Sequence, residues 1–165
     1  MLKPAALVGQ VILYGAFAAF IGTFASSPKY QQIPDDVALI KLSISHLGGR
    51  ECRKRTPEEL AKMPPNMRAP MDCPRERSDI RLEVDLDGQP VFRAVMHPTG
   101  LYKDGVSTVY KRFEVKAGSH QLAVRMDDDL MKPGFDYIKD EKITLAPGQV
   151  MVIDFNPDRG GLFFK

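Results

Sequence analysis

Residues 4–26 form one uninterrupted apolar run, PAALVGQVILYGAFAAFIGTFAS, with no charge and with Gln10 as its only strongly polar side chain. A helix rises 1.5 Å per residue, so this run would be roughly 34 Å long. That length crosses a hydrocarbon core of about 30 Å with some tilt. The pattern therefore predicts a single membrane-spanning helix, and residues 1–27 are expected to form the cytoplasmic end and the anchor.

A cleaved signal peptide is the alternative, because Thr23-Phe24-Ala25 before Ser26 is a tolerable cleavage site. Two features favour a retained anchor. The run exceeds the roughly 7 to 15 apolar residues of a signal-peptide core, and Lys3 is the only charged side chain before it.

Small side chains recur at spacings of three and four within this run, which places them on one face of the expected helix. Small residues let transmembrane helices approach closely. The stripe predicts packing against other membrane-spanning helices; in an ordinary anchor, small residues would be frequent without forming an interface. The stripe consists of Gly15, Ala18, Ala19, Gly22 and Ala25.

From residue 37 the pattern changes to alternation, which is typical of half-buried strands. Ala38, Ile40, Leu42 and Ile44 lie on one face of the expected strand, and Lys41, Ser43 and Ser45 lie on the other. Two hairpins and a final strand pair are expected further on, with turns at Asp87-Gly88, Ala117-Gly118 and 146–149; the expected strands are 80–86 with 91–96, 106–115 with 120–126, and 142–145 with 150–155.

Seven or so short strands with regular turn signals predict a mainly β domain. The expected fold is an antiparallel sandwich of immunoglobulin-like or prealbumin-like type over residues 37–157. Residues 28–36 would be the linker and residues 158–165 a C-terminal tail.

Residues 47–78 interrupt the strands with a proline-rich insertion. Thr56-Pro57-Glu58-Glu59 predicts a short helix with a capping box, because Thr at the N-cap and Glu at N3 satisfy the free amides of a helix start. Cys52 and Cys73 are the only two cysteines, and an even pair that encloses a loop predicts a disulfide in an oxidising compartment.

Charge and cysteine together predict the location. Lys3 and the amino terminus place the short end in the cytoplasm by the positive-inside bias. The expected location is the bacterial inner membrane, with a single pass and the C-terminal domain in the periplasm. The chain carries 23 basic and 21 acidic residues, a near balance that does not call for nucleic acid as a partner.

The segments FEVKAGSHQLAVRM and KITLAPGQVMVIDF resemble the strand-turn-strand phrases of PEGA-type and related prealbumin-like β-sandwich repeats. The resemblance covers residues 80–156. It implies a surface or interaction module without chemistry of its own, and it transfers no functional residues.

Candidate catalytic and metal-binding groups are sparse. His46, His97 and His120 are far apart and lie in no zinc motif, and His120 is expected to be a hydrogen-bonded core residue. Asp127-Asp128-Asp129 lacks the alternate spacing and the glycine of a calcium loop, so a solvated turn is expected. We therefore expect no enzyme activity, no catalytic residue and no cofactor.

Methionine side chains near Cys73 suggest a copper site as the most specific metal-binding hypothesis, because thioether sulfurs select Cu(I). Met63, Met67 and Met71 are spaced four apart. Prolines 64, 65 and 70 prevent one helix from aligning these sulfurs, and Met is also an adaptable packing residue. Copper binding is kept as an alternative.

Basic residues flank both cysteines, and a disulfide would gather them into one patch for partner carboxylates or lipid phosphates. A solvated loop is the other interpretation. The expected patch consists of Arg50, Arg53, Lys54, Arg55, Arg68, Arg75 and Arg77.

These features predict a non-catalytic accessory or assembly subunit of an inner-membrane complex, with respiratory or photosynthetic electron transfer as the expected host. Its partners would be other integral membrane subunits and membrane lipid. The alternatives are a periplasmic copper-delivery factor for an oxidase and a free-standing envelope-binding module.

Overall fold

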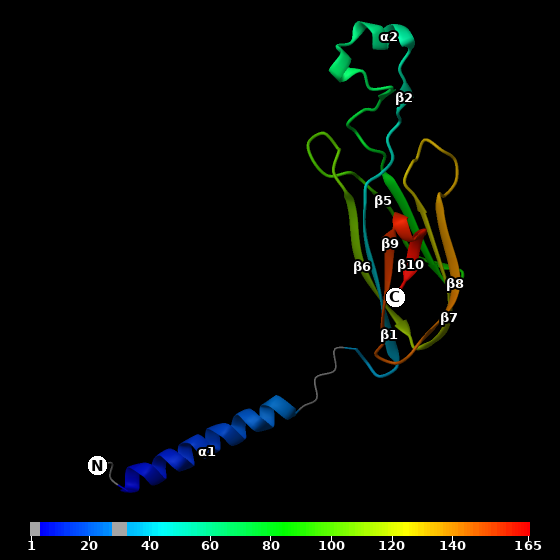
Figure 1. The fold of residues 1–165 in the computed structure, drawn as a ribbon. Helices are drawn as coiled ribbons and strands as arrows, with labels where there is room; N and C mark the ends of the chain where they lie inside the picture. Colours follow the sequence, from blue (N-terminus) through cyan, green and yellow to red (C-terminus); the bar gives the residue numbers. More distant parts are fainter. Residues whose placement is uncertain (1–3, 28–32) are drawn as a thin grey trace. The chain divides into compact units, whose positions relative to one another are not determined.

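A computed structural model of the chain describes residues 4–27 and 33–165 (Figure 1). The chain forms two compact units, Met1–Ile33 and Pro34–Lys165. Most of the linker expected at residues 28–36 lies outside the described residues.

The first unit contains the helix α1, Pro4–Ser26. Its apolar side chains make no buried core within the unit. The hydroxyls of Thr23 and Ser26 donate to the carbonyls of Ala19 (2.8 Å) and Gly22 (2.6 Å), so these polar groups are satisfied within the helix. The helix is long and apolar enough to cross a membrane, a test that a signal sequence also passes.

The second unit is mainly β and contains two four-stranded sheets. One sheet has the order β10-β9-β1-β6 and the other the order β5-β4-β7-β8. Their strands are β1 (Val37–His46), β4 (Ile80–Leu86), β5 (Gln89–Met96), β6 (Ser107–Lys116), β7 (Gly118–Asp127), β8 (Tyr137–Leu145), β9 (Val150–Asn156) and β10 (Gly161–Phe164).

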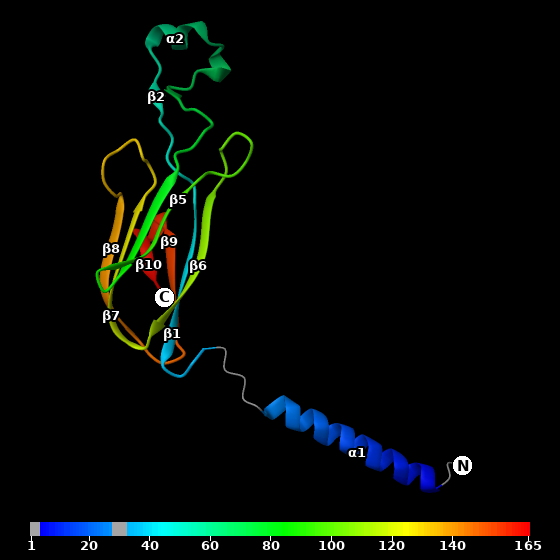
Figure 2. The same ribbon diagram turned by 180° about the vertical axis from the view of Figure 1, so that it is seen from behind.

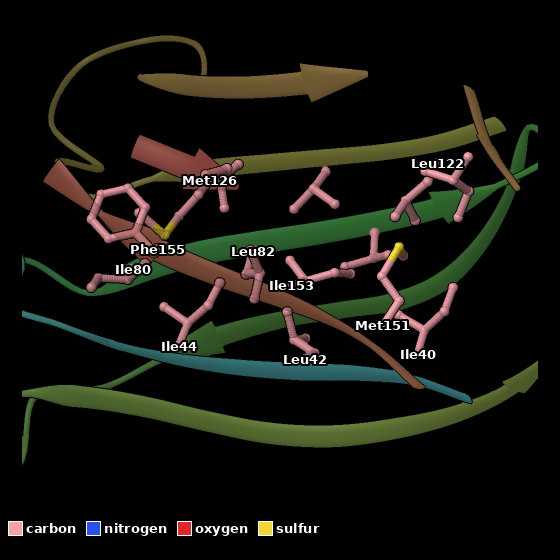
Figure 3. Close-up of a cluster of buried hydrophobic side chains, with 14 of the residues drawn as sticks. Ile40, Leu42, Ile44, Ile80, Leu82, Leu122, Met126, Met151, Ile153 and Phe155 are labelled. Atoms are coloured by element: carbon pink, nitrogen blue, oxygen red, sulfur yellow. The ribbon is translucent and has the colours of Figure 1, made fainter. Parts of the chain in front are cut away.

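The two sheets bury one shared hydrophobic core between them (Figure 3). Alternate residues of each central strand point into it, as the period-two pattern predicts. Apolar burial of this kind is the main driving force for folding. The fully buried large apolar side chains are Ile40, Leu42, Ile44, Ile80, Leu82, Val84, Leu122, Val124, Met126, Leu145 and Ile153.

The predicted hairpin at residues 80–96 is confirmed, but the other two predicted strand pairs are wrong. β6 pairs with β1, whereas β7 pairs with β4 and β8 in the opposite sheet. β8 and β9 are likewise in different sheets. Gly118 and Gly148 adopt positive φ angles (145° and 71°) at the connections. The chain therefore crosses from one sheet to the other where hairpins were expected.

Two further details differ from the prediction. The sheets are not purely antiparallel, because β1 and β9 run parallel. Residues 161–164, expected to lie in a tail, form β10 and pair with β9. Gly161 has φ 106°, and a Cβ there would lie 2.7 Å from the Tyr137 ring, so only glycine fits this start of β10.

The chain enters the second unit at one end, where β1 begins, and the insertion projects from the opposite end (Figures 1 and 2). Two loops lie at this same end, residues 97–106 between β5 and β6 and residues 128–136 between β7 and β8. We call the insertion and these two loops the distal pole. The insertion contains β2 (Arg53–Lys54), α2 (Pro57–Lys62), the 3-10 helix η1 (Pro65–Met67) and β3 (Met71–Asp72), and a second 3-10 helix, η2 (Pro157–Arg159), precedes β10.

Candidate functional site

The insertion is closed at its base by the predicted disulfide between Cys52 and Cys73. Next to the bridge, β2 and β3 pair antiparallel, with Arg53 opposite Asp72. A loop closed by a disulfide loses less conformational entropy on folding than the same loop without the disulfide. The base of the insertion is therefore a covalent and hydrogen-bonded clamp.

The predicted capping box is present at the start of α2. Thr56 Oγ1 accepts from the Glu59 amide (3.3 Å), and Glu59 Oε2 accepts from the Thr56 amide (2.8 Å). The second of these bonds, with help from Arg53, lowers the pKa of Glu59. The cap fixes a helix that is too short to be stable alone.

Two of the predicted patch arginines hold the insertion together from inside. Arg53 pairs with Glu59 (3.0 Å) and with Asp72 (2.7 Å). Arg55 pairs with the other Asp72 oxygen at 2.7 Å, and this hydrogen bond lowers the pKa of the Asp72 carboxyl. Asp72 of β3 thus binds Arg53 of β2 and Arg55, which follows β2 directly.

Two more arginines connect the insertion to the loop 97–106. Arg75 pairs with Asp104 at 2.7 Å and stacks on the Tyr102 ring, 4.5 Å from its centroid. Arg77 donates to the carbonyls of Asp104 (3.1 Å) and Gly48 (3.0 Å). The guanidinium of Arg75 lowers the pKa of Asp104.

The charge left for a partner is smaller than the sequence suggests. Among the described residues, Arg50, Lys54 and Lys62 make no ion pair, and all three are exposed. Arg68 donates to the Met63 carbonyl at 3.0 Å. The unpaired cations of the described insertion therefore lie before and beside the disulfide, at Arg50 and Lys54, and at the end of α2, at Lys62.

The three methionines of the copper hypothesis have different environments. Met67 and Met71 are 61% and 39% exposed. The Met63 sulfur accepts from Arg55 Nη1 at 3.4 Å. A guanidinium at this sulfur places positive charge where Cu(I) would bind, which favours a packing role for Met63.

The expected solvated turn at residues 127–129 is wrong, because each carboxylate has a separate partner. Asp127 is 1% exposed and pairs with Arg81 at 2.9 Å. Asp128 accepts from His46 at 2.7 Å, and Asp129 pairs with Lys132 at 2.8 Å. Asp127 and Asp128 connect this region to the strands β4 and β1, whereas the Asp129 pair lies within the loop 128–136.

The histidines also have separate partners. His46 pairs with Asp128, His97 with Asp79 (3.0 Å) and His120 with Asp87 (2.7 Å). His120 lies on the inward face of β7 and is hydrogen-bonded, as expected, but it is half-buried at the edge of the core and not a core residue. No group of three His, Cys, Asp or Glu residues that could hold a metal occurs within 4–27 and 33–165.

Two of the edge strands, β6 and β5, carry features that oppose strand addition. Lys111 of β6 lies on the same, core-facing side of the strand as Val109 and Phe113, yet its side chain is exposed. β5 contains Pro90, and the β4–β5 register shifts between Val84 and Asp85. Inward-facing charges, proline and bulges protect edges from pairing with another chain.

The sequence did not point to the two distal loops, although both expose large apolar side chains. Leu101 and Tyr102 are 91% and 59% exposed, and Met131 is 71% exposed. The only sequence signal is that Gly100 and Gly105 enclose Leu101 and Tyr102. Exposed apolar residues on a fixed loop are typical of protein contact sites.

Comparison with protein-family models, curated proteins and solved structures gives no match.

Proposed function

We propose that the protein is a non-catalytic accessory or assembly subunit of a bacterial inner-membrane complex, with a respiratory or photosynthetic electron-transfer complex as host. α1 stays attached as a single-pass anchor with its amino terminus in the cytoplasm. The β domain, of immunoglobulin-like or prealbumin-like type, lies in the periplasm and binds other subunits.

The observation that carries this proposal is the construction of the distal pole. A disulfide, a capping box and internal ion pairs fix a projecting loop, while Lys54 and Lys62 remain unpaired on it among the described residues. Preorganised loops lose little entropy on binding. Since the β5 and β6 edges oppose strand addition, the fixed loops are better suited to a partner than these edges.

A protein partner fits the insertion better than lipid. The insertion lies at the end of the domain opposite to the end at which the chain enters (Figure 1). The insertion combines the unpaired Lys54 and Lys62 with the exposed Met67 side chain, a mixture that suits an acidic protein surface with apolar contacts. Lipid is then the partner of α1.

The test is extraction of the native membrane in mild detergent, followed by a native gel and identification of the co-migrating chains. The Lys54→Glu/Lys62→Glu variant should migrate apart from the complex. Lys116→Glu/Lys142→Glu makes the same charge change on exposed strand residues and should co-migrate. Migration of the wild-type chain alone would favour a free-standing envelope module and would reject the proposal.

Two measurements test the anchor and its orientation. Amino-terminal sequencing of the membrane-bound protein should start before Pro4, whereas a start at Ser26 would show a cleaved signal peptide. A reporter fused after Lys165 should be active only outside the cytoplasm. The copper alternative requires stoichiometric Cu(I) to remain on the protein after reconstitution.

A further inference from the structure

Two neighbouring clefts lie at the distal pole, each against one of the apolar loops. One cleft, of ≈ 360 Å³, lies against Leu130 and Met131, and the other, of ≈ 370 Å³, lies against Leu101 and Tyr102. They share Pro74, Glu76 and Lys103 as lining residues. We call the two clefts together the distal groove.

The wall formed by residues 99–106 is fixed by its own hydrogen bonds. The Gly105 amide donates to the Thr99 carbonyl at 2.9 Å, and Thr99 Oγ1 donates to the Val106 carbonyl at 3.0 Å. A Cβ at Gly105 would lie 2.3 Å from Thr99 Oγ1, so this packing requires glycine. Leu101 is thus held in solvent by a rigid loop.

The opposite wall is fixed as well. Ser78 Oγ accepts from the Leu130 amide at 3.0 Å, and Asp129 Oδ1 accepts from the Met131 amide at 3.2 Å. Lys132 pairs with the same aspartate at 2.8 Å. The groove therefore presents apolar side chains on two prebuilt walls.

Four carboxylates line the Met131 cleft, together with Arg77 and Lys103, and Arg75 lines the Leu101 cleft. The three cations are engaged: Arg77 by backbone carbonyls, Lys103 by Glu76 at 3.0 Å and Arg75 by Asp104 at 2.7 Å. Asp79 and Asp129 pair with His97 and Lys132. Among the described residues Glu51 has no ion pair and is exposed, so its carboxylate is the lining charge available to a ligand.

We infer that the distal groove binds a protein segment in which a Lys or Arg side chain is flanked by apolar side chains. The cation would enter the cleft beside Glu51, and the apolar groups would contact Met131 on one side and Leu101 on the other. This inference rests on the proposed function, in that the segment would belong to a subunit of the host complex. A small cation would leave both apolar walls uncovered, and an acidic segment would be repelled.

The experiment uses the full chain in nanodiscs of zwitterionic lipid, with empty nanodiscs as the blank. A displayed library of random peptides is selected on these nanodiscs, and enriched peptides are synthesised and titrated by fluorescence anisotropy. The enriched peptides should carry Lys or Arg between apolar residues. Enrichment of acidic peptides, or of none, overturns the inference.

Groove variants then test the site. Leu101→Ser/Met131→Ser should weaken peptide binding by about tenfold or more, because it removes apolar contact area. Glu51→Gln should weaken it by about threefold, as for a partly solvated ion pair. Met67→Ser changes a comparably exposed side chain outside the groove and should leave binding unchanged. Equal loss in all variants, or displacement of the peptide by lysine amide alone, would reject the site.

Failure of this inference is distinguishable from failure of the proposed function. If the Leu101→Ser/Met131→Ser variant still co-migrates with the complex and no peptide binds, the subunit role stands and the groove has no ligand. If peptides bind as expected but the wild-type chain migrates alone, the groove binds a segment while the subunit role is wrong.

Discussion

Asp127 and Arg81 show how single residues position the distal pole. Asp127 is almost fully buried, and Arg81 pairs with it, donates to the Gly134 carbonyl at 2.8 Å and stacks over Phe135 at 4.5 Å. The sequence could not reveal this arrangement, because the partners are 46 positions apart, and His46 and Asp128 are 82 apart. The carboxylates of Asp127 and Asp128 therefore appeared solvated in the sequence, because their partners are distant in the chain.

Replacing Asp127 by asparagine should lower the free energy of unfolding by about 2 kcal/mol, since a buried bond to a charged group is lost. Arg81 remains partly solvated, which limits the cost. The measurement is urea unfolding of the full chain in micelles, followed by near-UV circular dichroism. The exposed Asp136→Asn control should change stability by no more than about 0.5 kcal/mol, and equal effects of the two variants would contradict the argument.

His120 should make stability fall at alkaline pH. Its ring nitrogens face Asp87 Oδ2 (2.7 Å) and the Lys116 carbonyl (2.8 Å), so the imidazolium donates two hydrogen bonds. The bond to Asp87 raises the pKa of His120 above its ordinary value of 6.5. Because the pKa of His120 is higher in the folded than in the unfolded state, its protonation stabilises the fold. This stabilisation is fully present below pH 6.5 and is lost as the pH rises through the folded-state pKa.

The test is the unfolding free energy of the full chain as a function of pH. It should decline above pH 6.5, and His120→Gln should flatten this decline. His97→Gln, in which the side chain is 73% exposed, should keep the wild-type slope. An unchanged slope in His120→Gln would show that the two hydrogen bonds do not depend on protonation.

At the scale of elements, local signals were read correctly and the connections between sheets were not. The capping box of α2 and the β4–β5 turn depend on neighbouring residues, so the sequence predicts both. The turns after β6 and β8 contain similar glycine signals but lead into the other sheet. Alternation of apolar and polar residues predicts which face of a strand is buried. It does not predict which of the two sheets the strand joins, because the pattern is the same in either sheet.

The disulfide should stabilise the insertion and have little effect on the sandwich. Cys52 and Cys73 are 21 residues apart, and closing such a loop contributes about 3 kcal/mol on the chain-entropy model. In Cys52→Ala/Cys73→Ala, hydrogen exchange should accelerate across residues 53–72 while the β4 and β7 amides stay protected. Peptide mapping without reductant should recover the linked pair from the native protein, and uniform loss of protection in the variant would show that the insertion is part of the core.

At the scale of the whole molecule, the chain divides the proposed function between an apolar helix and the distal pole of a β domain. The sequence predicted the helix because composition and length alone define a membrane span. The sequence did not predict the distal groove, because the residues that line the groove come from the insertion and from two separate loops. Only the fold brings these short, irregular segments to one end of the sandwich.

The last prediction concerns the small-residue stripe of α1. Apart from the helix's own neighbouring backbone, none of the described residues lies within 4 Å of a Cβ built at Gly9, Gly15 or Gly22, so leucine at these positions meets no obstacle among them. Close packing of small residues is what holds transmembrane helices together. Gly15→Leu/Gly22→Leu should therefore leave insertion intact, as measured by membrane fractionation, and should release the protein from its complex on a native gel.

Gly9→Leu is the matched control, because at 100° per residue Gly9 lies about 120° from Gly15 and about 140° from Gly22 around the helix. It adds the same side chain to the same helix and should not change co-migration. If Gly15→Leu/Gly22→Leu also co-migrates with the complex, α1 is a simple tether and the distal pole must supply the binding to the host complex. If both variants are released, helix packing involves more than the stripe, and the assignment of its face is wrong.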